Sequence, residues 1–155
     1  MGATFINIEL EVRAPFALDG LAESFGEQFV ANYCGRIGPR KYLLSGSCFS
    51  QRSRANGPDG IALALCRMIN RLPPSAKKVW KRASDRVFDV GLDANLDRRV
   101  IVDLLEPKTL AQIAKVGARL AVSVYTLDIE AERTPFRPED KRVDRKSDPP
   151  KRKRR

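Results

Sequence analysis

Alternation of apolar and polar residues near the N-terminus constrains the fold of this chain more than any other feature. Over residues 4–13 every second side chain is apolar and polar or charged side chains fill the positions between: Ile6, Ile8, Leu10 and Val12 against Asn7, Glu9, Glu11 and Arg13. A period of two predicts a β-strand with one buried face and one solvent-facing face. We therefore expect an antiparallel or mixed sheet that is covered on one face only.

The remaining elements alternate between strand and helix patterns. We predict strands over 29–37, 41–49, 86–93, 98–105 and 119–127, with 86–93 and 98–105 joined as a hairpin. Helices are predicted after Asp19, over 61–72, after Ser75 and after Pro107, with Asp19 and Ser75 as N-caps and Gly117 closing the last helix. This order predicts an α+β fold: a single mainly antiparallel or mixed sheet with helices packed on one face.

The chain divides by composition into a globular domain, residues 1–127, and a charged tail, residues 128–155. The tail contains four prolines and few apolar residues, which predicts disorder. Residues 141–155 hold nine basic and two acidic residues, so they carry +7 of the net charge of +10. The tail ends in a basic cluster: Lys151, Arg152, Lys153, Arg154 and Arg155.

The spacing of the cysteines and the hydropathy of the chain indicate its cellular compartment. No apolar run reaches the roughly 20 residues that cross a bilayer, and no signal peptide is recognisable, so we expect a cytoplasmic protein without membrane contact. The three cysteines contain no C-x-x-C pair, which fits a reducing environment. Cys66 is predicted to be an inert core thiol, and a reactive thiol at Cys34 or Cys48 is the alternative.

The second half of the chain resembles a known family. The strand Arg86–Leu92 (Arg-Val-Phe-Asp-Val-Gly-Leu) is followed by the helix-and-strand run Leu110–Tyr125 (Leu-Ala-Gln-Ile-Ala-Lys-Val-Gly-Ala-Arg-Leu-Ala-Val-Ser-Val-Tyr), and Trp80 precedes both. Over about residues 61–127 this pattern is similar to a family of short bacterial α+β proteins classed as a domain of unknown function. The resemblance implies a bacterial origin and a fold, and it implies no activity.

Missing residue types exclude several reaction classes. The chain has no histidine, which removes histidine-dependent triads, the usual general base near neutral pH and the commonest zinc ligand. Neither a P-loop nor a dinucleotide-binding glycine motif is present. We therefore predict no catalytic residue and no cofactor.

A group of aspartates could bind a metal ion. Asp89, Asp93, Asp97 and Asp103 lie around the predicted hairpin, and converging carboxylates could hold Mg²⁺ or Mn²⁺. The simpler interpretation is that Asp93 and Asp97 favour a turn, and the hairpin register places Asp89 and Asp103 on opposite faces. Asp89 and Asp103 are therefore only weak candidates.

Basic residues offer two candidate nucleic-acid contacts. Lys77, Lys78, Lys81 and Arg82 lie on one side of the helix that contains Trp80, where they form either a solvated face or a phosphate-binding surface. The basic cluster at residues 151–155 can bind polyanions through counterion release, bind an acidic protein surface, or only aid solubility.

Three functions remain, in order of preference. The first is a non-enzymatic module that binds another protein, such as an immunity, regulatory or accessory factor. The second is an accessory protein that binds DNA or RNA through the basic tail and the Lys77–Arg82 helix face. The third is a carboxylate-dependent, metal-assisted enzyme.

Overall fold

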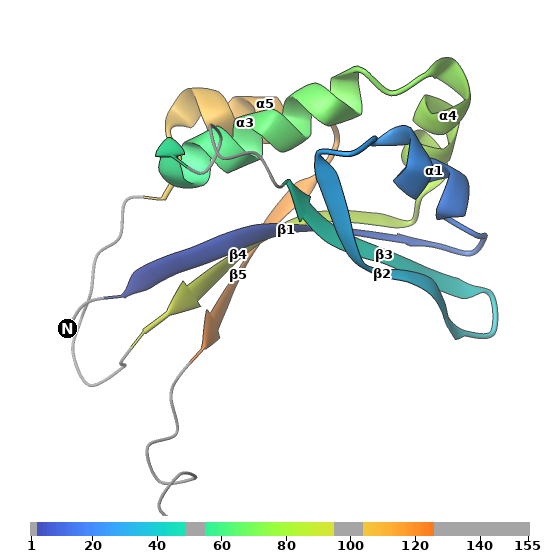
Figure 1. Cartoon of the computed structure of the whole chain (residues 1–155), viewed down its shortest axis with the longest axis horizontal. Coiled ribbons are helices and arrows are strands. Elements are labelled where there is room, and N and C mark those ends of the chain that lie inside the picture. The colour runs from blue at the N-terminus through green and yellow to red at the C-terminus, as the bar shows by residue number, and fades with distance from the viewer. Residues whose placement is uncertain (1–2, 49–54, 95–103, 126–155) are drawn as a thin grey trace, which may run out of the picture.

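The computed structural model describes residues 3–48, 55–94 and 104–125 of the chain (Figure 1). Within these residues five strands form one sheet, and four helices accompany it. In chain order the elements are β1 (Thr4–Ala14), α1 (Asp19–Ser24), β2 (Phe29–Gly38), β3 (Lys41–Cys48), α3 (Gly57–Asn70), α4 (Pro74–Arg82), β4 (Asp85–Asp93), α5 (Pro107–Lys115) and β5 (Arg119–Tyr125).

The sheet is mixed, with strand order β2-β3-β1-β4-β5. Strand β1 lies at the centre and pairs antiparallel with β3 and with β4, and β2 pairs antiparallel with β3. Of the strand pairs in the described residues only β4–β5 is parallel, and α5 lies in the connection between these two strands. Figure 1 shows the helices on one side of the sheet and an open face on the other. The predicted α+β class is therefore confirmed.

The core forms where the helices meet the central strands. Ile8, Leu10 and Val12 of β1 are fully buried, as the alternation predicted, and Phe88 and Val90 lie beside them on β4. The same alternation placed Ile6 on the buried face, but Ile6 is 52% exposed, because the register of β1 with β4 shifts between Phe5 and Asn7. Helix α3 contributes most of the covering layer through its apolar stripe: Ile61, Leu65 and Ile69. Burying each such side chain stabilises the fold by about 1.5–3 kcal/mol.

The predicted hairpin of residues 86–93 and 98–105 is wrong. Strand β4 pairs with β1 along one edge and with β5 along the other, so neither edge is left for a hairpin partner. Leu104 and Leu105 are not in a strand, and residues 95–103 lie outside the described residues. A short loop after β4 suggested the hairpin, but the parallel pairing with β5 occupies that edge instead.

Two predicted N-caps are also wrong. Helix α1 has Leu18 at its N-cap and already includes Asp19, while α4 has Pro73 at its N-cap and begins at Pro74, ahead of Ser75. Neither helix has a side-chain capping hydrogen bond. Proline suits the first turn of a helix because its missing N–H would have no intrahelical acceptor there. The prediction that Pro107 opens a helix is confirmed, and Gly117, with φ of 75°, follows its end.

Candidate functional site

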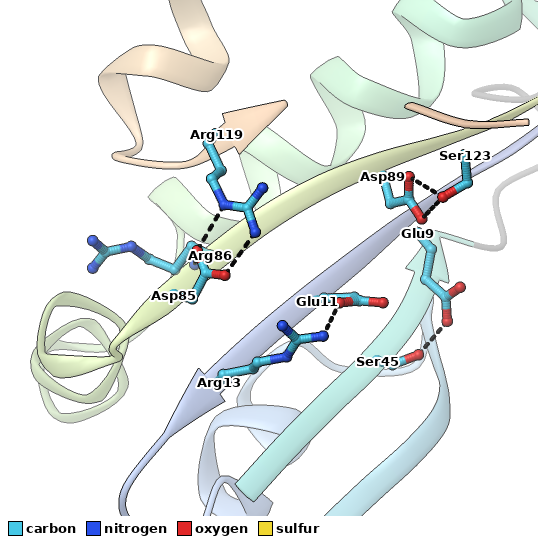
Figure 2. Close-up of polar contacts among 9 residues, drawn as sticks. All are labelled: Glu9, Glu11, Arg13, Ser45, Asp85, Arg86, Asp89, Arg119 and Ser123. Carbon is cyan, nitrogen blue, oxygen red and sulfur yellow. Dashed lines mark hydrogen bonds and ion pairs between the residues drawn. The ribbon is translucent and has the colours of Figure 1, made fainter. Parts of the chain in front are cut away.

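The open face of the sheet carries a row of polar side chains that contact one another (Figure 2). Arg119 of β5 forms a two-pronged ion pair with Asp85 of β4, through Nε to Oδ1 at 3.0 Å and Nη2 to Oδ2 at 2.8 Å. The Arg119 hydrogen bond holds the pKa of the Asp85 carboxyl below its ordinary value. Glu11 accepts a hydrogen bond from Arg13 at 3.1 Å. These pairs are partly exposed, so each contributes little to stability.

Asp89, one of the two candidate metal ligands, is already hydrogen-bonded. Both of its carboxylate oxygens accept from the Ser123 hydroxyl, at 2.9 and 2.7 Å. Glu9 lies directly opposite Asp89 in the register of β1 and β4 and accepts hydrogen bonds from Ser45 and Asn32. Among the residues that the structure describes, no group of three Asp, Glu or Cys side chains could hold a metal ion. Asp103, the other candidate, lies outside them.

The four predicted cations of α4 divide into two pairs. Lys77, Lys78, Lys81 and Arg82 are all exposed. Lys77 and Lys81 line a pocket of about 300 Å³, together with Arg86 of β4 and Lys115 of α5. Lys78 and Arg82 are not among its lining residues, and the Arg82 guanidinium lies 5.1 Å from the centre of the Phe16 ring.

Sequence reasoning missed Arg86 and Lys115. Arg86 has the same strand parity as Phe88 and Val90, which places it on the helix-covered face of β4. A charged residue at a core-facing strand position is a detectable signal, because such a side chain needs partners. Lys115 is 34 or more residues from the α4 lysines, and only the packing of α5 brings it close. The basic cluster at residues 151–155 lies outside the described residues.

Among the strands that the structure describes, β5 is an edge strand, and its apolar side chains are incompletely covered. Leu120, Val122 and Val124 share the helix side of the sheet, because they lie beside Phe88, Val90 and Leu92 in the β4–β5 register. The β4 residues are 0%, 0% and 8% exposed, whereas their β5 neighbours are 39%, 48% and 47% exposed. The helical layer therefore covers β4 fully and ends over β5.

The three cysteines are free, and two of them, Cys34 and Cys66, have thiols with raised pKa values. Cys66 is buried in α3, and burial raises the pKa of its thiol to about 11. The predicted core position of Cys66 is therefore confirmed, and its inertness stays a prediction. Burial also raises the pKa of the Cys34 thiol, which makes its thiolate scarce near neutral pH.

A scan against protein-family models, a search of curated proteins and a search of solved structures each found no match for this chain. The resemblance to a bacterial domain of unknown function therefore stays a prediction. No helix in the described part of the chain is long and apolar enough to cross a membrane.

Proposed function

We propose that this protein is a non-enzymatic binding module that docks a partner protein along strand β5. The proposal rests on the difference in side-chain exposure between neighbouring strands. Val90 of β4 is 0% exposed, whereas Val122, its neighbour on β5 and on the same face of the sheet, is 48% exposed. Contiguous exposed apolar side chains at a sheet edge are typical of protein interfaces. The absence of histidine favours binding over acid–base catalysis.

The other edge strand, β2, also exposes apolar side chains, but its backbone is less suited to pairing. Its register with β3 shifts twice, between Ala31 and Tyr33 and between Arg36 and Gly38. Bulges of this kind protect an edge, because they twist its backbone away from a flat pairing geometry. Strand β5 pairs with β4 without a register shift and contains no proline or charged residue after Arg119.

The occupant that fits β5 is an extended segment of another protein, added to the sheet as a sixth strand. Its backbone would pair with the outward amides and carbonyls of β5, and its alternate apolar side chains would cover Leu120, Val122 and Val124. A cytoplasmic location belongs to the same proposal and is supported by the free state of Cys34, Cys48 and Cys66.

The test replaces one apolar side chain on each edge strand. Val122→Asp puts a charge in the middle of β5, and Val30→Asp makes the same change on β2, where Val30 is 45% exposed. After a stoichiometric partner is isolated and purified, we expect Val122→Asp to weaken its affinity on the order of 30-fold or more, and Val30→Asp to leave it nearly unchanged. Hydrogen exchange should also slow at the outward amides of β5 when the partner is added.

Two outcomes would contradict the proposal. The first is that no stoichiometric partner exists, or that the partner binds Val122→Asp as well as the unchanged protein. The second is that light scattering finds a dimer that Val122→Asp dissociates, because the occupant would then be a second copy of this chain.

Nucleic-acid binding is the second proposed function, supported by the exposure of all four cations of α4. The test is fluorescence anisotropy with random DNA and RNA at low and physiological salt. Binding by α4 requires that replacing Lys77, Lys78, Lys81 and Arg82 together by Gln lowers the affinity and the salt dependence. An unchanged affinity would remove α4 from the binding surface.

A further inference from the structure

The pocket that contains Lys77 and Lys81 lies where three helices end. It is bordered by Asn70 at the end of α3, by Lys77, Trp80 and Lys81 of α4, and by the chain from Lys115 to Gly117 at the end of α5. Its volume is about 300 Å³, at the small end of the range of ligand-binding pockets. Lys77, Lys81, Arg86 and Lys115 line it, and none of its lining residues is a carboxylate.

Hydrogen bonds join the elements that line this pocket. The Trp80 indole Nε1 donates to the Val116 carbonyl at 2.8 Å. Arg86 Nε donates to the Gly117 carbonyl at 2.9 Å, and Nη1 donates to the carbonyls of Trp80 and Lys81 at 2.9 and 3.2 Å. The Arg86 guanidinium also lies 5.9 Å from the centre of the Trp80 ring.

Carbonyls at the helix ends beside the pocket accept hydrogen bonds from donors other than the lysines. Cations near helix C-termini usually compensate the negative end of the helix dipole. Here Arg86 and Trp80 already occupy carbonyls at the ends of α4 and α5. Within the described residues no salt bridge involves Lys77, Lys81 or Lys115.

Strand alternation removes the nearest carboxylate from the pocket. Asp85 precedes Arg86 in the chain but points to the open face of the sheet, where it pairs with Arg119. Figure 2 shows Arg86 directed away from the Asp85–Arg119 pair. The positive charge of the pocket is therefore not cancelled by its closest acidic neighbour in sequence.

Two other pockets lack this combination. The larger, of about 650 Å³ along α3, mixes Asp59 and Glu106 with Arg67, Arg71 and Lys108. The other, of about 440 Å³, contains Arg13, Arg40 and Lys41, but Arg13 is paired with Glu11.

We infer that the pocket of Lys77, Lys81, Arg86 and Lys115 binds the phosphate group of a small phosphorylated molecule. Arg86 supplies a positive charge that three hydrogen bonds hold in place, and the three exposed lysines supply ammonium donors. The small volume favours a compact phosphate ester over a large cofactor. This inference is independent of the docking of a protein along β5.

The single tryptophan of the chain, Trp80, provides a probe of this pocket alone. The indole N–H resonance of the full-length protein is followed by nuclear magnetic resonance during titration with inorganic phosphate and with inorganic pyrophosphate, at low ionic strength. Two double variants on the same helix are compared: Lys77→Gln with Lys81→Gln, and Lys78→Gln with Arg82→Gln. Both remove two positive charges four residues apart, but only the first pair lines the pocket.

We expect a saturable shift of the indole resonance, weakened about 10-fold or more in the first double variant and less than about 3-fold in the second, because charge-assisted hydrogen bonds are lost only in the first. Equal weakening in both variants would overturn the site, because it would reflect diffuse attraction. A shift that does not saturate would overturn it as well. An oligonucleotide that shifts the resonance at lower concentration than pyrophosphate does would overturn the small-molecule ligand.

Discussion

At Gly46 the strands β2 and β3 approach so closely that no side chain fits. A Cβ atom at this position would overlap the Val30 carbonyl oxygen and would lie 2.6 Å from Phe29 Cζ and 2.9 Å from Ala31 Cα. We expect Gly46→Ala to lower the free energy of unfolding by about 1–3 kcal/mol, because backbone atoms would have to move. Urea denaturation followed by circular dichroism measures the change.

Gly20 in α1 is the control for this substitution, because a Cβ there meets nothing within 4 Å. Gly20→Ala should raise the free energy of unfolding by up to about 1 kcal/mol, since alanine costs less backbone entropy in a helix. Equal stability of the two variants would show that the β2 backbone can move away from residue 46 at little cost in free energy.

The buried thiol of Cys66 makes the stability of the protein depend on alkaline pH. Its pKa is raised by burial from 9.0 to about 11 in the folded protein, so the folded state keeps the proton that the unfolded chain loses first. The stabilisation is complete below pH 9 and is lost between pH 9 and 11, at up to about 1.4 kcal/mol per pH unit.

Cys66→Ala should therefore be less stable at pH 7 but lose less stability than the unchanged protein between pH 9 and 11. The urea midpoints of the two proteins are compared at each pH. The other titrating groups are the same in both proteins, so their contributions cancel in the difference. Parallel pH profiles for the two proteins would mean that the thiol does not contribute.

Among the elements, α4 and the end of α5 are joined by the hydrogen bond from Trp80 to Val116. The indole is 4% exposed, so Trp80→Phe would leave the Val116 carbonyl without this donor in a buried site. We expect a loss of about 1–3 kcal/mol in the free energy of unfolding. Lys78→Ala, on the exposed side of the same helix, should change it by less than about 0.5 kcal/mol. Similar values for both variants would mean that the hydrogen bond is dispensable.

Sequence patterns predict an element well when its own residues determine it. The alternation of β1 from Ile8 to Val12, the apolar stripe of α3 and the proline at the start of α5 depend on local chemistry, and all three match the structure. The hairpin after β4 was wrong because strand pairing depends on residues distant in sequence. The alternation in β5 resembles that in β1, yet Val122 is 48% exposed and Ile8 is 0% exposed. Alternation identifies a face of a strand but not what covers that face.

The candidate sites, like the strand pairing, depend on residues that are distant in sequence. The cations of α4 were predicted from one helix, but the pocket that Lys77 and Lys81 line also needs Arg86 and Lys115 from two other elements. The separation of Lys78 and Arg82 from this pocket depends on how α4 packs. Composition alone could not distinguish these two pairs, because they have the same charge and the same spacing.

Across the whole molecule, positive charge is concentrated at the C-terminus. Residues 141–155 carry +7 of the net +10, and the five residues from Lys151 to Arg155 are consecutive cations. Replacing these five by Gln in the full-length chain should weaken binding to random DNA at low salt by about 10-fold or more and flatten its salt dependence, because fewer counterions are released. Fluorescence anisotropy between about 50 and 200 mM salt measures both quantities.

The matched comparison is the double variant in which Lys77 and Lys81 are both replaced by Gln. This variant removes charges from the pocket and leaves the basic cluster at residues 151–155 unchanged. It should alter DNA affinity less than the five-residue replacement, while it should weaken the response of Trp80 to pyrophosphate more. The reverse order would assign DNA binding to the folded domain. In that case nucleic-acid binding would become the better-supported function, and the exposed edge at β5 would need a different explanation.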